Sequence, residues 1–240
     1  MGGKIIVVPG LAVRRYAEEP AERLRQAGYE VDLRPALAWR GVPVDVAAYG
    51  RELGAEIVAA GNPVDVLVGL SAGTQAAAVA AATTPLVRRL VLVSPTMDPD
   101  SRTLVKMLGR YLKPNPNEKV ALFSEQLPDW SKAGPRRILN GFRSSLEVQL
   151  ENILGDVAAE LTIVHADYDQ LTSYAFAAQL AASFGGTLLV APSGSHSWPT
   201  NDSEGFLRLI NELMDSSKGD GPLEPPPGMA GQPVQKSRPR

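Results

Sequence analysis

A single serine stands between two glycines at a point where the residue pattern changes. An apolar run, "VDVLVG", is typical of a buried strand, and the alanine-rich "TQAAAVAAA" after it predicts a helix. Between them lies Gly69-Leu70-Ser71-Ala72-Gly73. A Gly-x-Ser-x-Gly turn from strand to helix is the context that presents a serine as a nucleophile, because side chains in place of the glycines would clash. The pattern therefore predicts nucleophilic chemistry at Ser71. The alternative is a glycine turn with Ser71 as a helix cap.

A serine nucleophile needs a general base, and the sequence offers only His165 and His196. His165 ends the apolar run "LTIVHA", where its ring is expected in the interior. His196 lies in the polar loop "PSGSHSWPTND", from which a mobile imidazole can reach the serine. The sequence therefore predicts that His196 is the base and that His165 is structural.

The base needs an acid to orient it, and this acid should follow a strand and precede His196. Asp167 and Asp169 both do so, in "HADYDQL". We favour Asp169, which stands just before the next expected helix, although it could instead cap that helix. Asp98, in "SPTMDPD", is the other candidate, because an acid there could approach the same histidine from a neighbouring strand.

Strands and helices alternate along the chain and would place these residues at the ends of strands. Strands are expected at residues 4–8, 29–35, 64–69, 88–95, 161–166 and 186–192. Helices are expected from Pro20 to Gly28, from an Asp45 cap to Gly61, after Ser71, and at residues 171–184 and 203–214. This order predicts an α/β protein with a compact, mostly parallel sheet of about six strands and helices on both faces.

Residues 97–158 interrupt the alternation and predict a helical cap insertion. Two sets of apolar residues each fit one helical face: Leu104, Met107, Leu108, Tyr111 and Leu112, and then Leu139, Phe142, Leu146, Leu150, Ile153 and Leu154. Such an insertion is either a lid or additional packing helices. Trp130, in "QLPDWSKAGP", is predicted to lie in a loop. It either lines a substrate pocket or anchors the insertion to the core.

Length and composition limit the classes of protein. The chain has 240 residues, enough for one domain over residues 1–218, and a proline-rich tail at 219–240 that is expected to be disordered. The net charge of -2 gives no basic face for nucleic acid. With no cysteine and two histidines, no metal site is expected. The N-terminal apolar run is too short for a signal peptide or a membrane span, so we expect a cytoplasmic protein with no membrane partner.

Four motifs together resemble the α/β-hydrolase superfamily. "VPGLA" resembles its oxyanion loop, "GLSAG" its nucleophile elbow, "HADYD" its acid turn and "SGSHSWP" its histidine loop. The resemblance extends from residue 4 to about 215. Two positions depart from the usual pattern: Pro9-Gly10 replaces His-Gly, and Ala166 replaces glycine in the acid turn. The resemblance implies an α/β-hydrolase fold that lacks the two leading strands common in the family.

The resemblance also implies a mechanism. Ser71, His196 and Asp169 would form a catalytic triad, and the backbone N–H groups of Leu11 and Ala72 would bind the oxyanion, with no metal or organic cofactor. The leading hypothesis is a hydrolase for a carboxylic ester or thioester of a small or medium apolar acyl compound. One alternative is acyl transfer, elimination of a small acid or carbon–carbon cleavage by the same triad. Another is a non-catalytic ligand-binding protein. The oligomeric state stays open.

Overall fold

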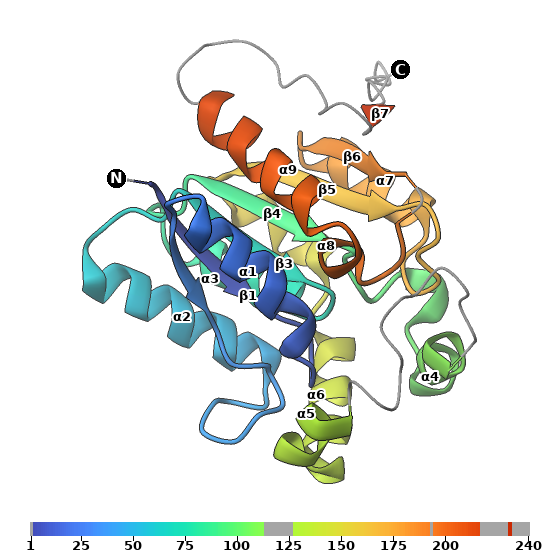
Figure 1. The fold of residues 1–240 in the computed structure, drawn as a ribbon. Coiled ribbons are helices and arrows are strands. Elements are labelled where there is room, and N and C mark those ends of the chain that lie inside the picture. Colours follow the sequence, from blue (N-terminus) through green and yellow to red (C-terminus); the bar gives the residue numbers. More distant parts are fainter. Residues whose placement is uncertain (1, 113–126, 193, 217–229, 232–240) are drawn as a thin grey trace.

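The computed structural model describes residues 2–112, 127–192, 194–216 and 230–231 (Figure 1). The predicted disordered tail, residues 219–240, therefore lies outside the described residues except for Ala230–Gly231. These two residues form a short strand, β7, that pairs antiparallel with β6 (Thr187–Ala191).

A single sheet forms the centre of the protein. Its other strands are β1 (Lys4–Val8), β2 (Glu30–Leu33), β3 (Val66–Leu70), β4 (Arg89–Val93) and β5 (Glu160–Ala166). The order is β2-β1-β3-β4-β5-β6-β7, and the first six strands are parallel. Every residue of β3 and β4 is buried, as expected for Val- and Leu-rich strands covered on both faces. The predicted fold class is confirmed.

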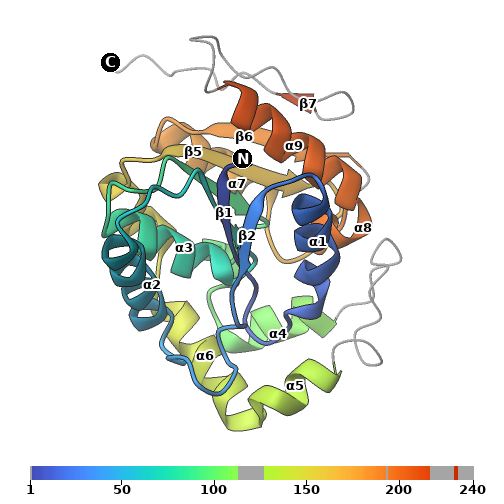
Figure 2. The ribbon, with the colours of Figure 1, turned by 60° about the vertical axis from the view of Figure 1, so that its left-hand side comes forward.

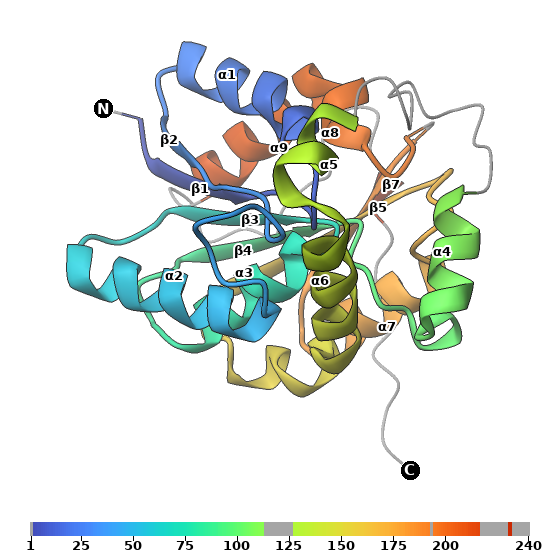
Figure 3. The same ribbon diagram turned by 90° about the horizontal axis from the view of Figure 1, so that it is seen from below.

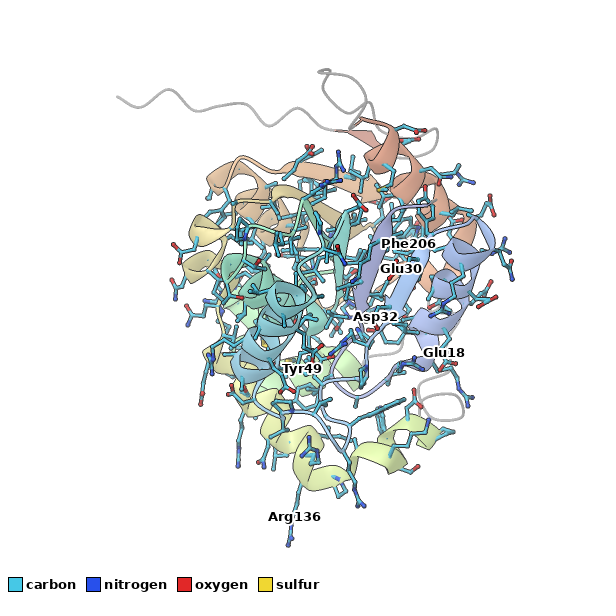
Figure 4. All side chains as sticks on the ribbon, turned by 90° about the vertical axis from the view of Figure 1, so that its left-hand side faces the viewer. Glu18, Glu30, Asp32, Tyr49, Arg136 and Phe206 are labelled. Carbon is cyan, nitrogen blue, oxygen red and sulfur yellow. The ribbon has the colours of Figure 1, made fainter. Side chains whose placement is uncertain are left out.

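Helices cover both faces of the sheet. One face carries α1 (Glu18–Gln26), α8 (Trp198–Asn201) and α9 (Ser203–Ser216), and the other carries α2 (Val46–Ala60), α3 (Gly73–Ala82) and α7 (Tyr174–Ser183) (Figure 3). Each face has its own apolar core, represented by Phe206 and Tyr49, which Figure 4 labels. In the described part of the chain, no helix combines the length and apolar character needed to cross a membrane.

The helix after Ser71 is held closely between the sheet and α2. The α2 helix begins where the sequence predicts, because the Asp45 carboxylate accepts a hydrogen bond from the Ala48 N–H at 2.6 Å. A Cβ atom built on Gly50 would lie only 2.6 Å from the carbonyl oxygen of Ala76. Small residues on both helices thus allow α2 and α3 to approach each other closely.

The insertion between β4 and β5 is helical, and its longer helices lie beyond the carboxyl ends of the strands (Figure 2). It consists of η2 (Pro99–Ser101), α4 (Leu104–Leu112), α5 (Leu127–Ala133), α6 (Pro135–Glu147), η3 (Leu150–Asn152) and η4 (Leu154–Asp156). Residues 113–126 of the predicted insertion are outside the described residues.

Two local expectations for the insertion were wrong. The apolar face expected to run from Leu139 to Leu154 is not one helix: α6 ends at Glu147, because Val148 adopts an extended conformation with φ -92° and ψ 103°. Leu139 itself is 37% exposed. Trp130 is not in a loop but in α5. Pro128 stands in the first turn of this helix, where proline is tolerated because its missing N–H has no helical partner.

Candidate active site

Ser71 occupies the strained turn between β3 and α3. Its φ angle is 55°, in the left-handed region that costs a non-glycine residue about 1–3 kcal/mol. The Ser71 N–H donates to the carbonyl oxygen of Val93 at 3.0 Å, and the Ser71 carbonyl accepts from the N–H of Thr74 at 3.0 Å and from its hydroxyl at 2.6 Å. These three bonds hold the strained backbone.

The glycines on either side of Ser71 are required by close backbone contacts. A Cβ atom built on Gly69 would lie 2.5 Å from the Cα atom of Thr74. One built on Gly73 would lie 2.5 Å from the carbonyl oxygen of Pro9, in the loop after β1. The Gly-x-Ser-x-Gly spacing therefore allows strand, turn and helix to meet here.

His196 contacts both other predicted triad residues. Its Nε2 atom is 2.8 Å from Oγ of Ser71. Its Nδ1 atom is 3.0 Å from each carboxylate oxygen of Asp169. The structure thus brings together a hydroxyl, an imidazole and a carboxylate that are far apart in the sequence.

The loop that carries His196 is fixed on both sides. On one side the Tyr168 N–H, in the acid turn, donates to the carbonyl oxygen of Gly194 at 2.8 Å. On the other side the N–H of Trp198 donates to the carbonyl of Ser195 at 2.9 Å, and the Trp198 side chain is buried in the core beside α9. These contacts limit the positions that the imidazole can adopt.

The carboxylate of Asp169 is fully buried and is held by its own turn. Oδ1 accepts hydrogen bonds from the N–H groups of Leu171 at 2.8 Å and Thr172 at 3.1 Å. Asp169 does not cap the following helix, because Ser173 has that role and accepts from the Phe176 N–H at 3.2 Å. Ser173 therefore caps the helix, and the Asp169 carboxylate contacts His196 instead.

The electrostatics of Asp169 fix the tautomer of His196. Burial raises the pKa of Asp169, but the charge of His196, its hydrogen bond, the Leu171 N–H and the Ser94 hydroxyl lower it, and the net pKa is below the usual range. Asp169 is then an ionised acceptor, so Nδ1 of His196 must be the donor. This leaves the lone pair of Nε2 directed at the Ser71 hydroxyl.

The other two acids considered lie elsewhere. Asp167 is exposed. Asp98 is buried, and its oxygens accept from the N–H groups of Asp100 at 3.0 Å and Ser173 at 3.2 Å, while Arg110 of α4 lies 3.8 Å away. Asp98 thus links the insertion to the start of α7, next to the acid turn.

His165 lies in the interior, as the sequence indicates. It is 4% exposed and packs edge-on against Tyr174, with 5.7 Å between ring centroids. Burial lowers the pKa of His165 although Asp169 and Asp167 act in the opposite direction. A neutral, buried ring is consistent with a structural residue.

The loop after β1 carries the first predicted oxyanion donor. The Gly10 N–H is occupied, because it donates to the phenolic oxygen of Tyr16 at 2.6 Å. By contrast, the N–H groups of Leu11 and Ala72 donate to no acceptor within the described part of the chain. The Leu11 carbonyl is held by the Ala38 N–H at 2.6 Å. Among the described residues, this arrangement leaves two backbone donors without an internal acceptor. One directly follows Ser71, and the other directly follows Gly10, where an added Cβ atom would lie 3.3 Å from Cβ of Ser71.

The insertion contacts this loop directly. The buried carboxylate of Asp129, on α5, accepts from the N–H groups of Arg14 and Arg15, both at 2.9 Å. On α6, a Cβ atom built on Gly141 would lie 2.5 Å from Cδ1 of Leu11, so the helix packs tightly against the loop. The insertion therefore helps to set the position of the Leu11 backbone.

Further hydrogen bonds anchor the insertion to the body. The buried side chain of Gln75, on α3, donates to the carbonyl oxygens of Ser145, at 2.7 Å, and Val148. The Ser144 hydroxyl donates to the helix-capping carboxylate of Asp45 at 2.9 Å. Because Gln75 lies one turn after Ser71, these bonds connect the end of α6 to the helix that follows Ser71.

Sequence reasoning missed several of these residues. Asp129 acts through contacts with a loop more than 100 residues away, and Tyr16 through a hydrogen bond from Gly10 that no sequence pattern reports. Gln75 carries a visible signal, since it is the single amide in an alanine-rich helix. The described residues contain no group of three or more histidine, aspartate or glutamate side chains that could hold a metal ion.

Comparisons with known proteins identify the family and the fold of the chain. A family model described as the alpha/beta hydrolase family matches residues 5–209. The fold is similar to that of an N-formylmaleamic acid deformylase from Pseudomonas putida S16, with 17% identity, a TM-score of 0.66, and coverage of 88% of this chain and 92% of that one.

Two further solved structures share the fold. A hydrolase from Oleispira antarctica has 11% identity, a TM-score of 0.74, and coverage of 90% and 92% of the two chains. A bromoperoxidase from Bacillus anthracis has 16% identity, a TM-score of 0.68, and coverage of 89% and 92%. No curated protein matches the chain significantly. Because the family model spans most of the chain, this protein belongs to the alpha/beta hydrolase family.

Proposed function

We propose that the protein is a serine hydrolase that cleaves a carboxylic ester or thioester of a small or medium apolar acyl compound. The observation that carries the proposal is the continuous series of contacts from Asp169 through His196 to Ser71, at 3.0 Å and 2.8 Å. This geometry is within reach for proton transfer from the serine to the imidazole.

The mechanism follows from the tautomer of His196. Nε2 takes the Ser71 proton as Oγ attacks the substrate carbonyl, and Asp169 stabilises the imidazolium that forms. The imidazolium then protonates the leaving alcohol or thiol, leaving an acyl group on Ser71. Water, deprotonated by the same Nε2, hydrolyses this acyl-enzyme and returns the free acid.

The N–H groups of Leu11 and Ala72 are proposed to bind the oxyanion. Each donor of this kind contributes on the order of 3 kcal/mol to stabilisation of the transition state. The fixed position of the Leu11 carbonyl and the close packing of Gly141 against this residue support the assignment, because preorganised donors need not reorient during the reaction.

Apolar surroundings favour an apolar acyl group. Leu11 and Ala72 belong to one apolar cluster that also includes Val148 of the insertion and the partly buried Trp130 and Phe142. Residues 97–158 are therefore proposed to act as a cap that excludes water from Ser71. Such an environment binds acyl chains better than charged groups.

A panel of p-nitrophenyl esters and thioesters of increasing chain length, with a fluorophosphonate probe, tests the proposed function. We expect turnover that is highest for small or medium chains, and labelling confined to Ser71 in peptide mass spectra. A protein that binds a metabolite tightly, hydrolyses none of the panel and resists the probe would instead be a binding protein.

We propose that the indole of Trp130 lines the site that binds the acyl group. Replacing Trp130 by alanine tests this role. Because this indole is only partly buried, we expect a modest loss of stability, but a shift of the preferred chain length by at least two carbons as space is created. The measurement is kcat/KM across the ester panel, together with the thermal midpoint.

Leu139→Ala is the matched control, because this side chain lies in the same insertion but is 37% exposed. It should change neither quantity. If Trp130→Ala lowers the thermal midpoint strongly and leaves chain-length preference unaltered, Trp130 is an anchor of the insertion and not part of the acyl site.

A further inference from the structure

Ser94 is a strained and completely buried serine beside the catalytic acid turn. It follows β4 directly, is 0% exposed, and has a φ of 51°. Its N–H donates to the carbonyl oxygen of Val164, in β5, at 2.9 Å. Since Val93 pairs with Val164 in the sheet, Ser94 lies next to His165 at the carboxyl ends of two central strands.

Within the described part of the chain, the buried hydroxyl of Ser94 has no hydrogen bond that would explain its position. By hydrogen-bond distance and angle, its Oγ atom has no partner among the described residues. Buried polar atoms are nearly always paired, and leaving a hydroxyl unpaired is costly. The acid turn nevertheless packs against this segment, because the Thr172 hydroxyl donates to the carbonyl oxygen of Pro95 at 2.8 Å. In this position the Ser94 hydroxyl helps to lower the pKa of Asp169.

The two oxygens of Asp169 differ in their partners. Oδ1 accepts from the N–H groups of Leu171 and Thr172 in addition to His196. Among the described residues, Oδ2 accepts a hydrogen bond from His196 alone. A carboxylate oxygen accepts two hydrogen bonds readily, so Oδ2 has capacity for one more donor.

We propose that Ser94 is a positioning residue whose hydroxyl donates to Oδ2 of Asp169 as charge develops on His196, and so holds the carboxylate against Nδ1. The inference rests on the proposed function, because it assigns Ser94 a role in that same triad. No bond is made or broken at Ser94. Rotation of the Ser94 side chain, whose Oγ has no other hydrogen-bond partner among the described residues, supplies the donor when the imidazolium forms.

Other charged groups near Asp169 do not replace this donor. His165 approaches from β5 with its pKa lowered by burial, so it is neutral at physiological pH. Asp167 in the same turn is exposed, and Asp98 is engaged by the Ser173 N–H and by Arg110. Among these neighbours, the Ser94 hydroxyl is the neutral side-chain donor available to the carboxylate.

The test is a pH titration of the two histidines by NMR, for wild type, Ser94→Gly and Ser94→Ala. Glycine removes the hydroxyl and also favours a φ of 51°, so this variant is expected to fold even if alanine does not. His196→Gln assigns the signals. Without the Ser94 hydroxyl dipole, the electrostatic potential at His196 is more negative, which favours the imidazolium. The pH midpoint of the His196 titration should therefore rise by about half a pH unit or more.

Kinetics supply the second readout. With a p-nitrophenyl ester, kcat of Ser94→Gly should fall about tenfold, as expected on losing a hydrogen bond to a charged group, while KM stays unchanged. Thr96→Val is the matched control, because Thr96 has another buried hydroxyl without a hydrogen-bond partner in the described residues, two positions away. It should alter neither kcat nor the His196 midpoint.

The outcomes separate the inference from the proposed function, because the titration needs no substrate. An unchanged His196 midpoint in the folded Ser94 variants overturns the inference, whatever the enzyme hydrolyses. A shifted midpoint in a protein that cleaves no ester supports the Ser94–Asp169 contact and overturns the ester hydrolase. A shift of the same size in Thr96→Val would show a general loosening of the loop and would also overturn the inference.

Discussion

Replacing Ser71 by alanine is expected to lower kcat for ester hydrolysis by roughly 10⁵- to 10⁶-fold, the range seen when a triad nucleophile is removed. The reason is that Nε2 of His196, 2.8 Å from Oγ of Ser71, then has no hydroxyl to deprotonate. The backbone donors at Leu11 and Ala72 remain, so slow attack by water is the residual reaction. Single-turnover and steady-state assays with the best ester of the panel measure the loss.

Ser145→Ala is the control for a buried serine elsewhere in the protein. Ser145 is 0% exposed, and the group that it offers to Gln75 is its backbone carbonyl, which alanine retains. This variant should keep wild-type activity. If Ser71→Ala keeps more than a few per cent of the turnover while labelling by fluorophosphonate persists, the nucleophile is a different residue.

The predictable parts of the fold were those fixed by local sequence. Continuous apolar runs such as residues 4–8 predict buried parallel strands, because both faces of the sheet must be covered. The glycine spacing around Ser71 predicts the turn, because only glycine fits the close contacts with Thr74 and Pro9. The sheet and the location of Ser71 at a strand end therefore followed from residue types alone.

The remaining features depend on contacts between distant segments. Trp130 is bracketed by proline and glycine, which suggests a loop, yet Asp129 beside it binds the N–H groups of Arg14 and Arg15, more than 100 residues earlier, and fixes α5 in place. The end of α6 at Glu147 coincides with the hydrogen bond from Gln75 to the carbonyl of Val148. Helical periodicity cannot report such tertiary contacts.

The partners of Asp169, the proposed catalytic acid, were likewise beyond sequence reasoning. Ser94 looks like an ordinary residue at the end of a strand, and its strained φ and proximity to Asp169 depend on the packing of β4 beside β5. The sequence favoured Asp169 as the acid over Asp167, with Asp98 as the other candidate. The different partners of Asp169 and Asp98 in the structure lead to a second large prediction.

Replacing Asp169 by asparagine is expected to lower kcat about 10⁴-fold with the fold preserved. The N–H groups of Leu171 and Thr172 both point at the Oδ1 position, so the amide oxygen of asparagine must lie there. The amide NH₂ group then occupies the Oδ2 position and donates to Nδ1 of His196. This fixes the tautomer that carries its proton on Nε2, which cannot accept the proton of Ser71.

Asp98→Asn is the matched control, because it changes another buried aspartate, in the loop after β4. Its two oxygens accept from the N–H groups of Asp100 and Ser173, so one asparagine amide can satisfy only one of them. We expect a lower thermal midpoint but kcat within a few-fold of wild type, because the orientation of Asp169 comes from its own turn. A larger kcat loss for Asp98→Asn than for Asp169→Asn would assign the acid to the loop after β4, and equal losses would show that both act only through stability.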